Sequence, residues 1–339
     1  MSSILYLKTM KKLLFFLLPI LIIGCETNPK ENIESFDSAW NRINDVYPFL
    51  EFKKINWDSI YTIYRPKVES ANRKEFKLII NDMLSELEDV HVYHRKRVGI
   101  QRYPYKSPRQ IKDKNAISKS VIRKYFNERL KFSKGVLYGI SPENIGYIRF
   151  KSFHNKGLIV KLPEIFKYLS NTKGLIVDLR SPKGGDYNVL MAFVNYFMTT
   201  PLEKPELYIL EKIEQSPFQA SESEYIYTKP AVVLINGLTI SAGESTAEIL
   251  KQLPNVTVVG DTTCGGGGCS SNHTVQAIGE YELPNSLLIS VPTGYFKRYD
   301  GSHLEWNGVS PDVRVKQTET DINNSKDKQL EFAFSHLNK

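Results

Sequence analysis

The sequence predicts an α/β fold preceded by a small helical domain, and three observations support that prediction. The chain has 339 residues, of which 41% are hydrophobic and 24% charged, which is the usage of an ordinary globular protein. Up to residue 87, apolar residues recur at three- and four-residue steps. After Gly135, short β-branched or aromatic runs alternate with helical stretches. The composition excludes collagen-like, disordered and polytopic membrane proteins.

The first 24 residues have the layout of a secretory signal. Lys11 and Lys12 precede an apolar run, Leu13–Ile23, which is shorter than the roughly 20 residues that span a bilayer. The run ends in Leu-Ile-Ile-Gly-Cys, which resembles the lipobox of bacterial lipoproteins. We therefore expect residues 1–24 to be removed and Cys25 to be acylated, for example with palmitate, with residues 25–34 as a polar tether. A plain signal peptide with an incidental cysteine is the alternative.

Residues 35–94 are predicted to form a helical domain. Apolar residues follow helical spacing from Phe36 to Leu50 and again from Phe76 to Leu87. The periodicity stops at Leu87, and the polar residues that follow mark a junction at the edge of this domain.

The next segment, residues 95–134, is strongly basic. It holds fourteen Lys or Arg residues against Asp113 and Glu128, a local charge of +12, while the whole chain carries +8. We interpret the segment as a solvated linker, and docking on anionic lipid head groups or on an acidic partner is the alternative. The modest net charge does not indicate nucleic-acid binding.

Residues 135–316 are predicted to form the α/β domain. Strands are expected at 145–150, 175–179, 231–235, 256–259 and 287–291, and helices near 159–169, 187–198 and 242–252. Functional sites in such domains lie where strands end and helices begin. Residues 317–339 are expected to add a C-terminal helix.

Ser241 stands where the strand 231–235 leads into the helix 242–252. Ser241 and Glu244 have the Ser-x-x-Glu spacing of a capping box, in which both side chains satisfy backbone N–H groups. The same position suits a nucleophile, because the N–H groups and dipole at a helix start can stabilise a developing oxyanion. Gly184 and Gly185, after the strand 175–179, could supply a second donor or form a simple glycine turn.

Apart from Cys25, the chain contains two cysteines, Cys264 and Cys269, which bracket four glycines. An even number of cysteines in an exported chain makes a disulfide between them possible, and two free thiols are the alternative. No zinc-type Cys/His spacing occurs, and the glycine run lacks the Lys-Ser/Thr of a phosphate loop. We therefore expect no metal and no cofactor.

Several motifs occur together and in order. They are Asp89-Val90-His91, Asp178-Leu179-Arg180 with Gly184-Gly185, Ser241-Ala242-Gly243-Glu244, Gly260–Gly265, and Gly308-Val309-Ser310-Pro311-Asp312. This combination resembles the serine peptidases that include the C-terminal processing peptidases, the tricorn core and the interphotoreceptor retinoid-binding protein repeats. The resemblance covers roughly residues 36–337 and implies a crotonase-like (ββα) catalytic domain. The PDZ module usual in processing peptidases is not expected, because only residues 95–134 occupy its interval.

The family has two catalytic designs, and this sequence resembles the tricorn-like one. The processing branch uses a Ser/Lys dyad, and Gly266 stands where its lysine would be. The tricorn-like branch uses a histidine that matches His91, so the resemblance implies Ser241 as nucleophile and His91 as general base. It further implies Glu305 as the carboxylate that orients the histidine. The implied oxyanion hole consists of backbone N–H groups, those of Ala242 and of Gly184 or Gly185.

One residue departs from the tricorn pattern. That pattern links histidine and carboxylate through a hydroxyl residue just before the histidine, and here that residue is Val90. The link must then be direct, pass through water, or use Asp89 instead.

These features predict a membrane-anchored serine endopeptidase that cleaves peptides or proteins through an acyl-enzyme. Its expected location is the bacterial cell envelope, held by lipidated Cys25 and facing the periplasm or the exterior. A catalytically silent relative that binds peptides or lipids is the alternative, motivated by Val90 and by the loop between Cys264 and Cys269.

Overall fold

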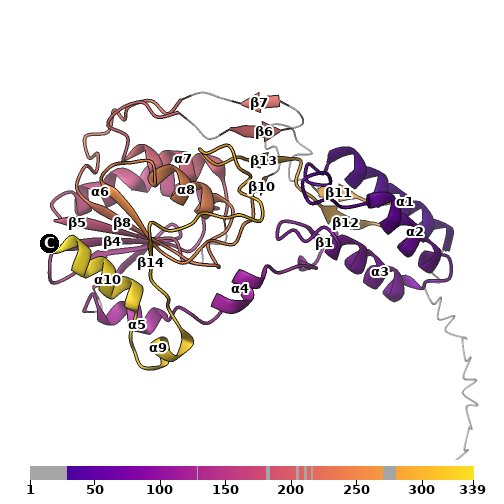
Figure 1. Ribbon diagram of the computed structural model, residues 1–339, viewed down its shortest axis with the longest axis horizontal. Coiled ribbons are helices and arrows are strands. Elements are labelled where there is room, and N and C mark those ends of the chain that lie inside the picture. The colour runs from indigo at the N-terminus through magenta and orange to yellow at the C-terminus, as the bar shows by residue number, and fades with distance from the viewer. Residues whose placement is uncertain are drawn as a thin grey trace, which may run out of the picture.

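The computed structural model describes residues 29–127, 129–180, 184–203, 206–209, 212–214, 217–269 and 280–339. A helical lobe and a larger α/β lobe lie side by side (Figure 1). The predicted signal peptide and Cys25 lie outside the described residues. Within the described ranges, no helix combines the length and the apolar composition needed to cross a bilayer.

The helical lobe is built from α1 (Pro29–Val46), α2 (Trp57–Val68) and α3 (Arg73–Ser85). Their apolar faces share one core, in which Phe36 and Ile80 are fully buried. α1 begins inside the predicted tether, residues 25–34, because its first turns are packed against the lobe. Asn32 is buried there, and its amide donates a hydrogen bond to the Ala71 carbonyl (2.9 Å).

A three-stranded sheet completes this lobe. Its strands are β1 (Tyr93–Lys96), β12 (Leu287–Ser290) and β11 (Glu280–Glu282), with β12 in the middle and antiparallel to both neighbours. Leu287 and Ile289 enter the core beneath the helices. The strand predicted at 287–291 therefore exists, but it belongs to the helical lobe and not to the α/β domain.

The α/β lobe is built on a seven-stranded sheet in the order β14-β9-β8-β5-β4-β3-β2. The central pairs β4–β5, β5–β8 and β8–β9 are parallel, so the carboxyl ends of these strands share one edge of the sheet. Arg180 follows β5 at that edge, and Ser241 lies beyond the end of β8. The strands are β2 (Lys131–Ser133), β3 (Val136–Ile140), β4 (Ile145–Phe150), β5 (Gly174–Asp178), β8 (Ala231–Ile235), β9 (Val256–Gly260) and β14 (Val313–Arg314).

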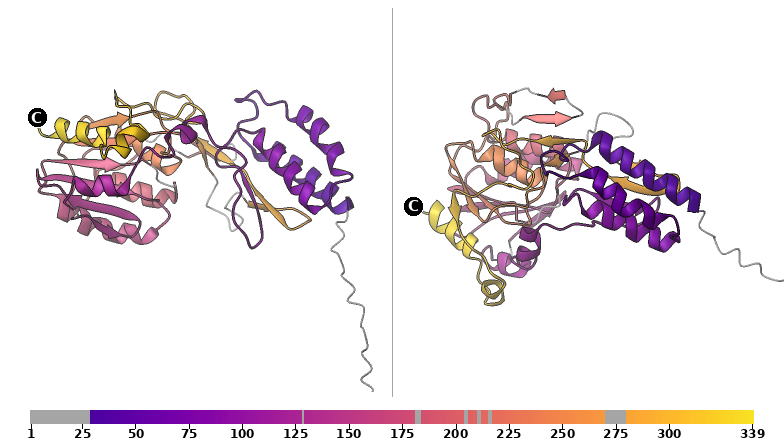
Figure 2. Two further views of the ribbon diagram at one scale, coloured as in Figure 1. Left: turned by 90° about the horizontal axis from the view of Figure 1, so that it is seen from below. Right: turned by 45° about the vertical axis from the view of Figure 1, so that its right-hand side comes forward.

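Helices cover both faces of this sheet (Figures 1 and 2). Neighbouring side chains of β5 point to opposite faces of the sheet. Leu175 therefore belongs to the core on the first face and Ile176 to the core on the second. The C-terminal helix predicted for residues 317–339 is present as α10, after the short α9. The first face carries the 3-10 turn η1 (Lys156–Lys161), α6 (Leu162–Leu169), α7 (Tyr187–Asn195) and α8 (Ala242–Leu250); the second carries α5 (Lys119–Lys124) and α10 (Lys328–Leu337), which follows α9 (Glu319–Asn323).

The segment predicted as a solvated linker, residues 95–134, is largely built into the fold: its first residues belong to β1, and from α4 (Pro108–Asp113) onward it packs on the α/β lobe. The Asp113 carboxylate accepts a hydrogen bond from the Gly237 N–H (2.8 Å). α4 is thereby fastened to the loop that leads to Ser241. A four-stranded sheet of short strands lies near the junction of the lobes: β10 (Gly268–Cys269), β13 (Gly294–Phe296), β6 (Leu207–Ile209) and β7 (Lys212–Glu214) (Figure 1).

Candidate active site

Ser241 precedes α8 and has a strained backbone. Its φ of 55° and ψ of −125° are seldom adopted by residues with a side chain. Gly184 lies directly against it, because a Cβ atom on Gly184 would lie 2.8 Å from Ser241 Cβ and 3.2 Å from Ser241 Oγ. Gly185 packs instead against the backbone of Phe153 and His154. Of the two glycines, Gly184 therefore lines the space around the serine hydroxyl.

The Glu244 carboxylate holds the segments around Ser241 together. It is fully buried and accepts hydrogen bonds from the Thr263 hydroxyl (2.6 Å) and from three backbone N–H groups. These belong to Gly265 (2.7 Å), Gly266 (2.9 Å) and Ser241 (3.0 Å). Burial raises the pKa of Glu244, against the lowering effect of these bonds. The carboxylate half of the predicted capping box is thus present, and it also ties the serine to the glycine loop.

His91 lies beside Asp89. Its Nδ1 is 3.7 Å from Asp89 Oδ1, which accepts the backbone N–H of His91 at 2.7 Å. Both ring nitrogens are shielded from solvent, and neither makes a hydrogen bond within the described residues. Burial acts to lower the pKa of His91, but the nearby carboxylates, Asp89 above all, outweigh it and raise this pKa above its usual value.

Gly266 lies close to His91 and is linked through Glu244 to Ser241. Its N–H and that of Ser241 donate to the same oxygen of Glu244, while a Cβ atom on Gly266 would lie 3.0 Å from His91 Cε1. The same Cβ would lie 2.7 Å from Val90 Cγ2. The imidazole and Val90 therefore occupy the space into which any side chain at position 266 would project.

Sequence reasoning did not identify Tyr47 and Lys53, which lie beside the candidate residues. Lys53 is fully buried, and its Nζ is 2.6 Å from Glu305 Oε1 and 3.9 Å from Asp89 Oδ2. The Tyr47 hydroxyl donates to Asp89 Oδ2 (2.8 Å) and accepts from Lys53 Nζ (3.1 Å). Asp89 thus accepts a hydrogen bond from a hydroxyl group, that of Tyr47 just after α1, although Val90, the residue before the histidine, has no hydroxyl group.

Glu305 lies in the same buried group but does not touch the histidine. Its Oε2 accepts the Gly267 N–H (2.8 Å), and its other oxygen meets Lys53. Burial and the neighbouring Asp89 raise the pKa of Glu305 to about 7, although Lys53 opposes this shift. Among the described residues, Asp89 is the carboxylate within 4.0 Å of a His91 ring nitrogen.

Of the two alternatives for Cys264 and Cys269, the structure has no disulfide between them. Cys264 is a buried free thiol, and its Sγ lies 3.5 Å from Ser107 Oγ, at the start of α4. Its side chain therefore faces α4, whereas Cys269 belongs to β10. From the same helix, Arg109 Nη1 donates to the carbonyls of Thr263 (3.2 Å), Cys264 (3.4 Å) and Trp306 (2.8 Å).

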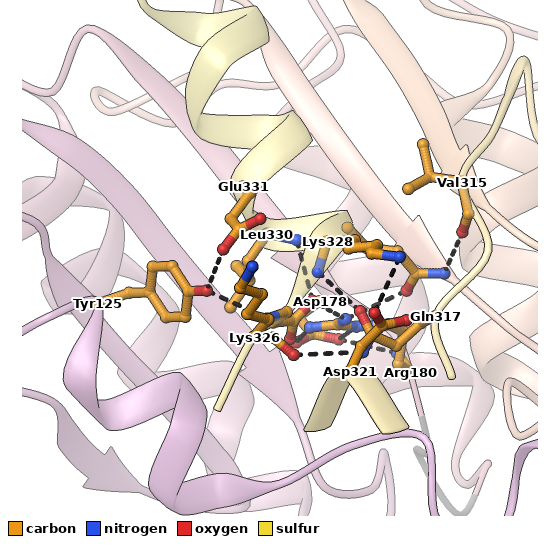
Figure 3. Close-up of polar contacts among 12 residues, drawn as sticks. Tyr125, Asp178, Arg180, Val315, Gln317, Asp321, Lys326, Lys328, Leu330 and Glu331 are labelled. Carbon is orange, nitrogen blue, oxygen red and sulfur yellow. Dashed lines mark hydrogen bonds and ion pairs between the residues drawn. The ribbon is translucent and has the colours of Figure 1, made fainter. Parts of the chain in front are cut away.

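A second buried charge cluster supports the strand that leads toward Gly184 (Figure 3). Arg180 has no exposed surface; its guanidinium contacts Asp178 (2.8 Å), the last residue of β5, and Asp327 (2.8 Å), just before α10. It also donates to Gln329 Oε1 (3.1 Å), and Tyr125 accepts the Asp327 N–H (3.1 Å). The C-terminal helix is thereby bonded to the segment that precedes the candidate oxyanion loop.

Two family models match the chain. The model for peptidase family S41 matches residues 144–315, and the model for the tricorn protease C1 domain matches residues 28–85. Among curated proteins, the carboxy-terminal processing protease CtpA of Bacillus subtilis is 31% identical over 180 residues, 52% of this chain and 36% of that protein. The nisin-resistance protein of Lactococcus lactis is 25% identical over 239 residues, 67% of this chain and 69% of that protein. This chain thus spans little more than a third of CtpA.

Solved structures share the fold over nearly the whole described chain. A protein of Parabacteroides merdae superposes with a TM-score of 0.77 at 24% identity, covering 92% of this chain and 97% of that one. Mature CPAF complexed with lactacystin gives a TM-score of 0.65 at 12% identity, with 91% and 98% covered. The tricorn protease gives 0.59 at 17% identity, and the match covers 91% of this chain and 36% of that chain.

Proposed function

Because this chain belongs to peptidase family S41, we propose that it is a serine peptidase with Ser241 as the nucleophile and His91 as the general base. Two features support this most: Ser241 has a strained backbone beside Gly184, and the imidazole of His91 is buried beside Gly266 with both ring nitrogens unbonded. Strained backbone at a helix start is a common feature of nucleophiles.

The proposed reaction uses these groups in sequence. Nδ1 of His91 faces Asp89, which leaves Nε2 to take the proton of the Ser241 hydroxyl as its Oγ attacks the substrate carbonyl carbon. The oxyanion forms next to the first N–H of α8, that of Ala242, and next to the Gly184 backbone. His91 then protonates the leaving amine, and water hydrolyses the acyl-enzyme by the reverse transfers.

Two carboxylates stabilise the imidazolium that forms during this transfer. Asp89 acts directly, and its carboxylate is kept in place by the Tyr47 hydroxyl and by the His91 N–H. Glu305 acts at longer range, through Lys53, which lies between the two carboxylates. In this proposal Tyr47 and Lys53 are positioning residues, since they reach the reacting atoms only through Asp89 and Glu305.

Membrane attachment is the second part of the proposal. The Leu-Ile-Ile-Gly-Cys sequence supports removal of residues 1–24 and acylation of Cys25, which would hold the protein on a bacterial membrane, facing the periplasm or the exterior. A lipoprotein from Streptococcus agalactiae shares the fold, with a TM-score of 0.55, and is compatible with this location. The substrates would then be peptides or proteins that reach the cell envelope.

The test is covalent labelling of the full-length protein with a fluorophosphonate, followed by mapping of the modified residue by mass spectrometry. Modification is expected at Ser241 and should disappear in Ser241→Ala and His91→Ala. His336→Gln, a histidine on α10 far from the serine along the sheet, serves as the control and should label normally. Absence of labelling in folded wild-type protein would refute the proposed activity and favour a silent relative that binds peptides or lipids.

A further inference from the structure

The loop after β1 exposes two aliphatic side chains at its tip. His94 and Arg102 exchange backbone hydrogen bonds (3.0 and 2.8 Å), so the residues between them form a closed hairpin. Val98 is 92% exposed and Ile100 is 88% exposed, more than any other large hydrophobic residue in the described ranges. Folding gains nothing from two aliphatic side chains held in water, so an exposed pair of this kind suggests a binding surface.

Cations surround the base of this hairpin. Lys77 on α3 lies near Lys96, Arg73 and Arg102, and burial together with repulsion from these cations lowers the pKa of Lys77. Arg73, Lys96 and Arg102 are exposed, and the described residues offer none of them an ion pair. We call Arg73, Lys77, Lys96 and Arg102 the basic collar.

Other charged groups near the hairpin are already compensated or neutral. Arg95 is paired with Glu280 on β11 (2.6 Å), and Arg97 lies 3.5 Å from Glu282. His94 is buried, and burial with the nearby Arg102 and Lys77 lowers its pKa to about 4, so it is uncharged at neutral pH. The basic collar therefore presents uncompensated positive charge around an apolar tip.

The hairpin tip also lies at the end of the lobe where the described chain begins. Lys96, at the tip end of β1, is paired with Leu287, and Asn285 in the preceding turn donates its N–H to Ser35 on α1 (2.9 Å). The left view of Figure 2 shows the purple loop after β1, the orange β11–β12 hairpin and the start of α1 on one side of the molecule. A lipid on Cys25, four residues before Pro29, would be attached at this side.

We propose that the hairpin tip docks on an anionic lipid bilayer, with Val98 and Ile100 at the boundary between head groups and acyl chains and the basic collar against lipid phosphates. Aliphatic side chains flanked by Lys and Arg are suited to the bilayer interface, and anionic lipids attract such cations. With the proposed acylation of Cys25, on which this consequence rests, the contact is a second attachment point and therefore fixes the orientation of the protein on the bilayer. This inference stands apart from the proposed peptidase activity, because no residue in it contacts Ser241 or His91.

The experiment places an environment-sensitive fluorophore on Val98→Cys in the full-length protein. Val160→Cys is the matched control, because Val160 is a 79% exposed aliphatic residue on η1 of the other lobe. Unsubstituted protein treated identically gives the background from native cysteines. Vesicles are made of phosphatidylcholine alone or mixed with phosphatidylglycerol, each with or without brominated acyl chains.

A label at position 98 is expected to shift to shorter wavelength and to be quenched by brominated lipid when phosphatidylglycerol is present. The label at position 160 should stay in water. Lys96→Gln with Arg102→Gln should require about tenfold more anionic lipid for the same signal. Equal responses at positions 98 and 160 would overturn the proposal and favour a protein partner, and an equal response to uncharged vesicles would overturn the role of the basic collar. Neither result depends on whether Ser241 reacts.

Discussion

Replacing Glu305 with Gln is expected to flatten the pH dependence of the protein's stability on the acid side of neutrality. Glu305 and Asp89 are both buried and share the single ammonium group of Lys53. Because two carboxylates compete for one cation, burial and Asp89 raise the pKa of Glu305 to about 7 from an ordinary value of 4.5.

The sign and size of the effect follow from that difference. Between these two pKa values the native protein keeps a proton on Glu305 that the unfolded chain has released, so protons favour the native state. The stabilisation from Glu305 is complete below pH 4.5 and is lost as the pH rises through 7. At about 1.4 kcal/mol for each unit of pKa, the loss across the interval approaches ~3 kcal/mol in the free energy of unfolding.

Urea unfolding of wild type and Glu305→Gln at a series of pH values measures this directly. The difference in free energy of unfolding between the two proteins should change by a few kcal/mol between pH 4.5 and 7 and stay constant above that range. Glu143→Gln, at an exposed position in the turn before β4, is the control and should run parallel to wild type. Parallel curves for Glu305→Gln would refute the reasoning, because Glu305 would then titrate alike in both states.

Three further predictions concern the serine, the glycine loop and the Arg180 cluster. Fluorophosphonate labelling of Ser241 should reach half its maximum above pH 6.5, because the base must be neutral and nearby carboxylates raise the pKa of His91. A midpoint below pH 6.5 would contradict the assignment of His91 as the base. Gly266→Ala should reduce labelling about tenfold or more by displacing the imidazole, while Gly99→Ala, whose new Cβ meets only ordinary contacts, should not. Arg180→Leu leaves the buried carboxylates of Asp178 and Asp327 without their cation and should lower the free energy of unfolding by about 3–5 kcal/mol in urea titrations. Arg314→Leu, at an exposed position, is the control and should lower it by about 0.5 kcal/mol or less. Equal urea midpoints for the two variants would count against a stabilising role for the Arg180 cluster.

The parts of the fold that the sequence predicts are those with a local signature. Helical spacing from Phe36 onward and the apolar run at Ala231–Ile235 correspond to α1 and β8 as expected, because each pattern reports burial within one element. The position of Ser241 at a strand-to-helix turn is readable for the same reason. Its strained backbone cannot be predicted from the sequence, because an ordinary helix cap has the same Ser-x-x-Glu spacing.

The rest depends on contacts between segments distant in sequence. Lys53 is buried between two carboxylates, whereas Lys54 beside it is exposed, and nothing in the sequence distinguishes the two lysines. The pairing of Leu287–Ser290 with β1 was also missed, because a short apolar run predicts a strand but not the sheet that the strand joins. Cys264 points toward Ser107 because α4 packs there, which is a tertiary contact that cysteine spacing cannot reveal.

The return of β11 and β12 to the helical lobe has a consequence for how the protein is made. A chain that emerges from the ribosome or an export channel N-terminus first presents α1, α2 and α3 long before Leu287 and Ile289 arrive to cover their apolar faces. Until then the lobe has an unfilled side that can bind a chaperone or a second nascent chain. We therefore expect newly made protein to need protection until these strands have been synthesised, because a chain cut before residue 280 lacks the residues that close this core.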